Sequence, residues 1–245
     1  MDLVIGRGEI GRALYYYLRQ FGEVENWGHE GIPDKDYTFA YICTGITKTK
    51  ECEERPLEAY GVNVENTIDL CERFPKGVWI SSERVFDGSK PFRDKRDSRS
   101  PTTEYGRQKV IAENFLLGEG YGVIRFSKVI GWDVPLFEGW INDIRQGKEI
   151  HPFSNMSMAP VSLEYACEVL RKIRGMRGLY QLSGDEDIPY DRIAKHICNY
   201  MGRDTDLVQP VESDRPHPHT TLISDFDRPD SWEVINEWCR KRLIE

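Results

Sequence analysis

The sequence of 245 residues predicts an α/β fold in which a doubly wound parallel sheet has helices on both faces. Two observations indicate this fold. Short segments rich in β-branched and aromatic residues recur along the chain, and stretches with helical periodicity separate them. A glycine-rich turn joins the first of these segments to the first helical stretch. The alternation fades after residue 131, so we expect a small additional lobe in the C-terminal half.

In chain order, the predicted strands are residues 3–5, 23–27, 37–43, 77–81, 121–126 and 178–182. Apolar stripes at helical spacing predict the helices between them: Ile10, Ala13, Leu14, Tyr17 and Leu18; Leu57, Tyr60, Val64, Ile68 and Cys71; Val110, Ile111 and Phe115; Leu163, Ala166, Cys167 and Leu170. Only residues 28–36 connect the second predicted strand to the third, which leaves no room for a helix and a further strand. An extended segment of this length spans about 30 Å. We therefore expect the sheet to be trimmed at one edge.

This organisation predicts two interleaved domains. Residues 1–131 form the sheet domain, to which a segment near 161–182 returns, and residues 132–245 form a lobe that binds the substrate. Two helical faces are expected in the lobe, one made by Tyr190, Ile193, Ala194 and Ile197, and one by Trp232, Ile235, Trp238 and Cys239.

Composition excludes several classes of protein. The formal net charge of −8 gives no basic field for nucleic acid, and no apolar stretch has the roughly 18 residues that a membrane span requires. The first residues do not resemble a signal peptide, and the six cysteines lack Cys-x-x-Cys spacing, so we expect a cytoplasmic protein with reduced thiols. The prolines beside His217 and His219 favour a surface loop over a metal site. We expect no metal.

The turn after the first strand reads Gly6-Arg-Gly-Glu-Ile-Gly11, a G-x-G-x-x-G that follows a strand and opens a helix. In that context the motif is typical of a Rossmann-type fold, where glycines let the backbone approach a pyrophosphate at the helix N-terminus. The same glycines also fit an ordinary tight turn. The motif makes these residues candidates for a dinucleotide site: Gly6, Arg7, Gly8, Glu9, Ile10 and Gly11.

The choice of dinucleotide depends on the end of the second strand. NAD enzymes place an acid about 20 residues after the glycines, and here that position falls near Asn26. Arg7 lies in the loop where a 2′-phosphate could be met. We therefore expect NADP(H) to be favoured over NAD(H), with Glu25 and Glu30 close enough to reverse the preference.

Tyr105 and Lys109 stand at i and i+4, so they share one face of a predicted helix. A positive charge beside a phenol favours the phenolate, and such a tyrosine can exchange a proton with a carbonyl or alcohol oxygen. The pair also fits an exposed tyrosine beside a solvated lysine. Ser82, at the carboxyl end of the fourth predicted strand, lies where open α/β sheets bind ligands and could hydrogen-bond the same oxygen.

Together these segments resemble the extended short-chain dehydrogenase/reductases, and among them the branch of dTDP-4-dehydrorhamnose reductases and related sugar nucleotide epimerases. The resemblance covers Gly6 to Gly11, residues 42–63 with Thr44, Gly45 and Asn63, the run from Ile80 to Gly88, the Tyr-x-x-x-Lys of Tyr105 and Lys109, residues 123–131, and Arg215-Pro216.

The resemblance implies that Ser82, Tyr105 and Lys109 are the catalytic set, with Tyr105 as general acid. The resemblance also implies that further residues hold a nicotinamide cofactor together with the glycine loop: Thr44, Gly45, Asn63, Tyr105 and Lys109. The alternative for Asn63 is a role in helix packing. Glu83 and Arg84 replace Asp and Tyr of the rhamnose enzymes, and Lys128 replaces an aromatic residue. These residues and Arg215 are candidates for substrate binding.

The implied function is reduction of a nucleotide-linked keto sugar in carbohydrate biosynthesis. The alternatives are a non-catalytic, dinucleotide-binding regulatory subunit of the same fold and a sugar nucleotide epimerase. The expected partner is a small nucleotide sugar rather than nucleic acid or membrane. A homodimer is a further possibility.

Overall fold

The computed structural model describes residues 1–243. The chain forms two compact units. The first unit comprises Met1–Asp87, Lys95–Phe126 and Leu163–Leu182, and the second comprises Gly88–Asp94, Ser127–Ser162 and Ser183–Glu245.

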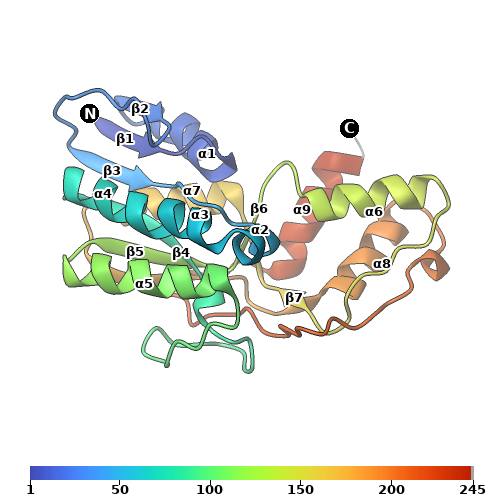
Figure 1. Cartoon of the computed structure of the whole chain (residues 1–245). Helices are drawn as coiled ribbons and strands as arrows, with labels where there is room; N and C mark the ends of the chain where they lie inside the picture. The colour runs from blue at the N-terminus through green and yellow to red at the C-terminus, as the bar shows by residue number, and fades with distance from the viewer. Residues whose placement is uncertain (244–245) are drawn as a thin grey trace. The chain divides into compact units, whose positions relative to one another are not determined.

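The first unit is built on a six-stranded sheet, visible in Figure 1. Its strands, in the order in which they lie side by side, are β2 (Val24–Trp27), β1 (Asp2–Ile5), β3 (Phe39–Ile42), β4 (Gly77–Ser82), β5 (Gly122–Phe126) and β9 (Gly178–Leu182). Every pair of neighbours is parallel. The chain passes from β2 to β3 without a helix, and β2 is the edge strand. The predicted parallel sheet, trimmed at one edge, is confirmed.

Helices cover both faces of this sheet. Side chains that alternate along the strands, such as Leu3, Ile42 and Trp79, face α4 (Asn66–Arg73) and α5 (Glu104–Gly118) in one buried cluster. These two helices lie in front of the sheet in Figure 1. On the opposite face α1 (Glu9–Leu18) packs against α7 (Leu163–Lys172). The inner strands, such as β3 and β5, are therefore shielded from water on both sides, which explains their largely apolar sequences, whereas the edge strand β2 is only half-buried.

The predicted stripe over residues 57–71 is wrong at its start, because Leu57 is 88% exposed. A π-helical turn at Gly61–Glu65 separates α3 (Pro56–Tyr60) from α4. A π turn adds a residue to the helical register and rotates what precedes it. Ala59 therefore faces the interior in place of Leu57, whereas Val64 and Cys71 are buried as predicted. A short helix that the sequence did not predict, α2 (Thr49–Glu54), precedes α3.

The predicted stripe on α5 is wrong at Ile111, which is 42% exposed, although Phe115 packs against the core. Gln108, Lys109, Ala112 and Glu113 are buried instead. The inward face of this helix is thus largely polar, and apolar periodicity does not reveal it.

The second unit has its own core of helices. It contains α6 (Pro135–Arg145), α8 (Tyr190–Tyr200) and α9 (Ser231–Leu243), whose apolar faces share one buried cluster. The predicted faces on the last two helices are confirmed. Two short strand pairs complete the unit: parallel β6 (Lys128–Ile130) with β8 (Pro160–Ser162), and antiparallel β7 (Ser157–Met158) with β10 (Ile188–Pro189).

The segment around His217 differs from the surface loop that the sequence predicts. His217 is buried, and a Cβ atom on Gly88 would lie 2.6 Å from its Nδ1. Gly88 has a positive φ of 72°. The absence of a side chain at Gly88 thus lets the imidazole pack against the backbone.

Three further facts concern residues 1–243. No helix there is long and apolar enough to cross a membrane. The cysteines are free thiols. No group of three or more His, Cys, Asp or Glu side chains in this range could hold a metal ion.

Candidate active site

The glycine turn between β1 and α1 forms a closely packed cradle. Gly6 has φ of 119°, and a Cβ there would lie 2.9 Å from the carbonyl carbon and oxygen of Cys43. A Cβ on Gly11 would lie 2.2 Å from the carbonyl oxygen of Gly6. Gly8, the N-cap of α1, has no atom within 4 Å of its Cβ position. Two glycines thus allow the turn to form, and the third leaves open space at the helix N-terminus, which suits an anionic pyrophosphate.

The end of β2 presents an amide where NAD enzymes carry an acid. Nδ2 of Asn26 donates to the carbonyl oxygens of Val4, over 3.1 Å, and Gly6, over 2.8 Å. Asn26 therefore ties β2 to the glycine turn. The guanidinium of Arg7 lies 5.9 Å from the centre of the Trp27 ring at the same end of β2.

Glu25, the nearest carboxylate in the sequence, is already engaged. It accepts hydrogen bonds from Lys35 over 2.5 Å, Tyr37 over 2.7 Å and Trp27 over 2.9 Å. These bonds, that of Lys35 foremost, lower the pKa of Glu25 to about 2. Its oxygens are thus committed to protein donors.

A second loop, after β3, lies beside the glycine turn. The Cβ position of Gly6 is 3.2 Å from the backbone nitrogen of Thr44. Asn63 fixes this loop, since its Oδ1 accepts from the backbone N–H of Ile46 over 2.7 Å and its Nδ2 donates to the Ile46 carbonyl over 3.0 Å. Nδ2 also donates to Oε1 of Gln108 over 2.8 Å. Asn63 therefore links the loop to α5 and supports its shape.

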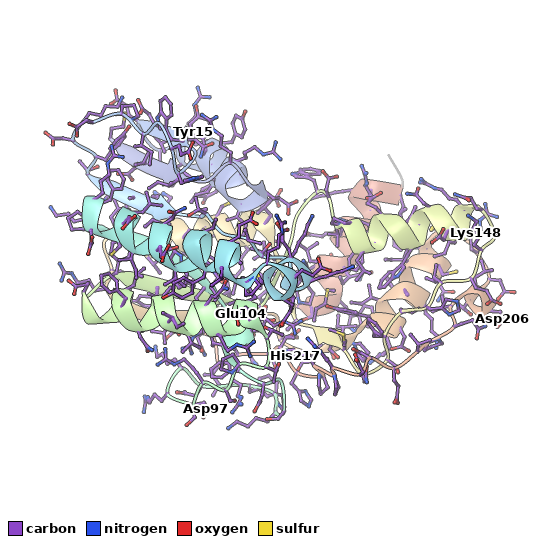
Figure 2. The ribbon with its side chains drawn as sticks, in the orientation of Figure 1. Tyr15, Asp97, Glu104, Lys148, Asp206 and His217 are labelled. Carbon is purple, nitrogen blue, oxygen red and sulfur yellow. The ribbon has the colours of Figure 1, made fainter. Side chains whose placement is uncertain are left out.

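Helix α5 brings Tyr105 to Ser82. Thr103 caps the helix by accepting from the N–H of Gly106 over 3.1 Å, and Glu104, labelled in Figure 2, lies in its first turn. A Cβ on Gly106 would lie 2.2 Å from the carbonyl oxygen of Arg84. Because Gly106 has no side chain, the first turn of α5 packs directly on the segment after β4, which ends at Ser82.

Polar contacts join the residues around Ser82. Its Oγ donates to Oε2 of Glu83 over 2.5 Å and accepts from the backbone N–H of Arg84 over 3.2 Å. The Ser82 hydroxyl is also close enough to Tyr105 to lower its pKa. Nε of Arg84 lies 3.1 Å from Oε1 of Glu83. Glu83 and Arg84 therefore belong to the surroundings of Ser82, and both oxygens of Glu83 are occupied.

The surroundings of Tyr105 keep its phenol protonated. Burial raises the pKa of Tyr105 most, and the Glu83 carboxylate raises it further. The neighbouring hydroxyl of Ser82 and the charge of Arg84 act in the opposite direction and lower the pKa of Tyr105. Tyr105 is thus held as a proton donor.

Lys109 is buried one turn further along α5. Its Nζ donates to the carbonyl of Ile80 over 2.8 Å and lies 4.1 Å from the centre of the Trp79 ring and 5.6 Å from that of Tyr105. The Cβ position of Gly45 is 4.0 Å from Nζ, so the lysine borders the loop after β3. Burial lowers the pKa of Lys109 to about 8, against the opposing charge of Glu113.

Sequence reasoning missed a buried ion pair between Glu113 of α5 and Arg125 of β5. Nε and Nη2 of Arg125 donate to the two oxygens of Glu113 over 2.8 and 2.7 Å, and Ser81 donates to one of them over 2.6 Å. Arg99 adds a contact at 3.2 Å. One available signal was an Arg within the apolar segment of β5, since a charge there requires a partner.

The candidate residues fall into two groups. The glycine turn, Thr44, Gly45, Asn63, Ser82 to Arg84, Tyr105 and Lys109 all lie in the first unit. Lys128 and Arg215 lie in the second unit and are exposed.

Comparisons with known proteins place the fold. The model of the family described as "RmlD substrate binding domain" matches residues 29–221. A search of curated proteins finds no match. The chain is 18% identical to a dTDP-4-dehydrorhamnose reductase from Bacillus anthracis, solved in complex with NADP, with a TM-score of 0.86 over 98% of this chain and 97% of that one.

Two further structures are similar. A dTDP-4-dehydrorhamnose reductase from Clostridium acetobutylicum is 20% identical, with a TM-score of 0.84 over 97% of this chain and 98% of that one. MoeE5 in complex with UDP-glucose and NAD is 17% identical, with a TM-score of 0.82 over 99% of both chains. At these identities the likeness shows a shared fold.

Proposed function

The chain belongs to the RmlD substrate binding domain family, and on that premise we propose that it is an NAD(P)H-dependent reductase of a nucleotide-linked keto sugar. The observation that supports this most is the meeting of Ser82, Tyr105 and Lys109 beside the glycine turn within one unit. A binding subunit without activity would not need a buried phenol held as a proton donor.

The residues that would hold the cofactor fit a dinucleotide. Gly6 and Gly11 allow the tight turn to form, Gly8 leaves open space at the N-terminus of α1, and Gly45 borders Lys109. The bound nicotinamide supplies the hydride, which no protein side chain can provide. Arg7, Glu9, Ile10 and Thr44 complete the proposed site in the two loops.

The proposed roles of the catalytic side chains follow from their contacts. Tyr105 donates its hydroxyl proton to the carbonyl oxygen of the sugar, and Ser82 orients the same oxygen. Lys109 would contact the bound cofactor, and its ammonium adds a positive charge near Tyr105. A phenol kept protonated by burial suits the direction of reduction.

We propose that NADPH binds more tightly than NADH. The support is Asn26, an amide where NAD enzymes use a carboxylate, together with the capture of Glu25 by Lys35, Tyr37 and Trp27. Arg7 would contact the 2′-phosphate. Titration of both cofactors checks this, and tighter binding of NADH would contradict it.

The substrate side is proposed from charge. Arg84 in the first unit and Lys128 and Arg215 in the second each carry a positive charge that suits a phosphate group, and residues 132–245 would form the substrate-binding domain. Glu83 has its two oxygens engaged and is better suited to act on Ser82 than on a sugar. The free cysteines favour a reducing, cytoplasmic setting.

The test is consumption of NADPH by the purified chain with a dTDP-linked 4-keto-6-deoxy sugar. We expect turnover in the wild type and a loss of about 10² to 10⁴ in kcat for Tyr105→Phe, with cofactor affinity little changed. A wild type that binds the dinucleotide tightly and does not reduce the sugar would instead be a regulatory subunit.

A further inference from the structure

A buried glutamine lies between the two catalytic candidates of α5. Gln108 is fully buried. It stands three residues after Tyr105 and one before Lys109, and it shares the inward face of the helix with them. A buried amide group destabilises a fold unless its donors and its acceptor have partners. The partners of Gln108 therefore show what this side chain does.

Two acceptors fix the orientation of the Gln108 amide. Its Nε2 donates to the carbonyl oxygen of Pro56 over 3.2 Å and to Oε1 of Glu104 over 3.0 Å. A backbone carbonyl and a carboxylate have no hydrogen to donate, so the NH₂ group of the amide must face them. The oxygen of Gln108 is thereby turned to Asn63, from whose Nδ2 it accepts a hydrogen bond over 2.8 Å.

The oxygen of Gln108 in turn fixes the amide of Asn63, which is also buried. Because Nδ2 of Asn63 faces this oxygen, its Oδ1 is left to face the backbone of Ile46. Oδ1 accepts from the Ile46 N–H over 2.7 Å, and Nδ2 gives its other hydrogen to the Ile46 carbonyl over 3.0 Å. A reversed amide would set a donor against the N–H of Ile46 and an oxygen against that of Gln108. Gln108 thus selects the orientation that holds Ile46.

Ile46 belongs to the loop after β3, which borders the proposed cofactor site. The residue before it, Gly45, has φ of 153°, in the region that favours glycine. The Cβ position of Gly45 lies 3.1 Å from Oδ1 of Asn63 and 4.0 Å from Nζ of Lys109. A change in the amide of Asn63 therefore acts directly on the part of the loop that faces Lys109.

On the basis of the proposed function, we propose that Gln108 is a positioning residue for the nicotinamide dinucleotide. It acts through Asn63, whose amide it orients, and so keeps the loop after β3 in the shape that binds the cofactor. Because Gln108 is fully buried, it offers no surface to a ligand. Its loss should therefore weaken binding of the dinucleotide and leave the proton donor Tyr105 in place.

The main test is fluorescence titration of Gln108→Met with NADPH. Methionine keeps the length of the side chain and removes its amide. We expect the dissociation constant to rise about tenfold, the size of effect that follows when a buried donor loses its partner. With a dTDP-linked 4-keto-6-deoxy sugar, kcat at saturating NADPH should stay within about twofold of wild type, since Tyr105 and Lys109 remain.

Gln181→Met is the matched control. Gln181 is also fully buried in the first unit, where its Oε1 accepts from Nη1 of Arg125 over 3.0 Å. It lies on β9, the edge strand opposite β2. Its replacement should lower stability and leave the affinity for NADPH unchanged, so the pair of variants separates positioning from a general loss of stability.

A double-mutant cycle shows whether Gln108 acts through Asn63. Asn63→Ala removes the amide that Gln108 orients, so it should weaken NADPH binding at least as much as Gln108→Met. Adding Gln108→Met to Asn63→Ala should then change the dissociation constant by less than about twofold. Circular dichroism checks that each variant is folded. If Gln108→Met does not fold, Gln108→Asn takes its place, because its amide is one methylene too short to reach Asn63 and Pro56 together.

Hydrogen exchange gives a readout without any dinucleotide. The N–H of Ile46 is held by Oδ1 of Asn63, so it should exchange about tenfold faster in Gln108→Met than in the wild type. In Gln181→Met it should exchange at the wild-type rate. This measurement by NMR reports on the loop alone.

The outcomes separate this inference from the proposed function. A wild type that binds NADPH while Gln108→Met binds it equally well overturns the positioning role and leaves the reductase function standing. Equal losses of affinity in Gln108→Met and Gln181→Met, additive losses in the double mutant, or an unchanged exchange rate at Ile46 also overturn it. A wild type that binds neither NADPH nor NADH overturns the proposed function, and the positioning role falls with it.

Discussion

Lys109 shows how one buried side chain combines opposing effects on its charge. The Ile80 carbonyl, the face of Trp79 and the Glu113 carboxylate all favour the ammonium. Removal from water disfavours it, and this effect is the largest, because the pKa falls from 10.5 to about 8. The folded protein therefore holds a cation that would be more stable in the unfolded chain.

The lowered pKa of Lys109 makes stability depend on pH in a defined direction. Between pH 8 and 10.5 the unfolded chain binds more protons at this site than the folded one, so the free energy of unfolding rises with pH there. The cost of the charge is fully present below pH 8. Lys109→Met removes this cost, so its stability relative to wild type should be greater at pH 7 than at pH 10, by about 2 kcal/mol.

Urea unfolding at both pH values measures this difference. Lys172→Met, which removes a half-exposed lysine paired with Glu168 on α7, is the control and should show no such change between the two pH values. An equal difference from wild type at pH 7 and pH 10 would mean that Lys109 titrates normally.

At the scale of single elements, α5 is where sequence reasoning failed most clearly and where the candidate site lies. The Tyr-x-x-x-Lys spacing places Tyr105 and Lys109 on one face without showing that it is buried, while Val110, Ile111 and Phe115 suggested another face as the inward one. Polar residues occupy the buried side because each has a specific partner, as Glu113 has Arg125. Apolar periodicity cannot reveal such a face, since the partners come from strands distant in sequence.

Glu113 and Arg125 tie α5 to β4 and β5, and breaking this pair should be costly. The side chain of Arg125 is 1% exposed, so Glu113→Gln would leave a buried guanidinium without its counter-charge. We expect a loss of about 3 to 5 kcal/mol in the free energy of unfolding. Urea unfolding checks this against Glu168→Gln, whose carboxylate is 43% exposed and whose loss should cost less than about 1 kcal/mol. A similar cost for both variants would contradict a strong buried pair.

Substitutions in the glycine turn should affect stability and ligand binding differently from one glycine to the next. Gly8 has φ of −70° and open space at its Cβ position. The free energy of unfolding of Gly8→Ala should therefore lie within about 1 kcal/mol of the wild-type value. Its methyl group would occupy the space where the backbone approaches a pyrophosphate, so we expect NADPH affinity to fall at least about tenfold.

Gly11→Ala is the opposite case, because its Cβ would overlap the Gly6 carbonyl oxygen, and it should lose stability. Gly118→Ala, with open space at the end of α5, should change neither property. If Gly8→Ala bound NADPH as tightly as the wild type, the dinucleotide would not bind at the glycine turn. Fluorescence titration and urea unfolding of the three variants decide this.

For the whole molecule, the sheet was predictable and the second unit only in part. Buried parallel strands have apolar runs bounded by turns, and the short 28–36 connection revealed the trimmed edge. The pairs β6 with β8 and β7 with β10 have strands of three residues or fewer, too short for any periodicity. Helix α6 starts at Pro135 within a segment rich in Gly and Trp, which concealed it. Long-range pairing, rather than local pattern, forms these parts.

The type of reaction is also a property of the whole molecule, because one fold supports several chemistries and only the side chains decide between them. Elimination or epimerisation next to a carbonyl needs a base that removes a carbon-bound proton. Glu83 is held by Ser82 and Arg84, and the guanidinium that follows it cannot accept a proton. We therefore expect reduction of the ketone alone.

Incubation of the enzyme, NADPH and a 4-keto-6-deoxy nucleotide sugar in deuterated water tests this expectation. The product should carry no solvent deuterium at C3 or C5 by mass spectrometry and NMR, beyond that of a sample without enzyme. Glu83→Gln tests the nearest carboxylate as the base, since a base that acts on carbon affects the labelling. Enzyme-dependent deuterium in the wild type that disappears in Glu83→Gln would show that Glu83 removes a proton from carbon, and the protein would then be an epimerase.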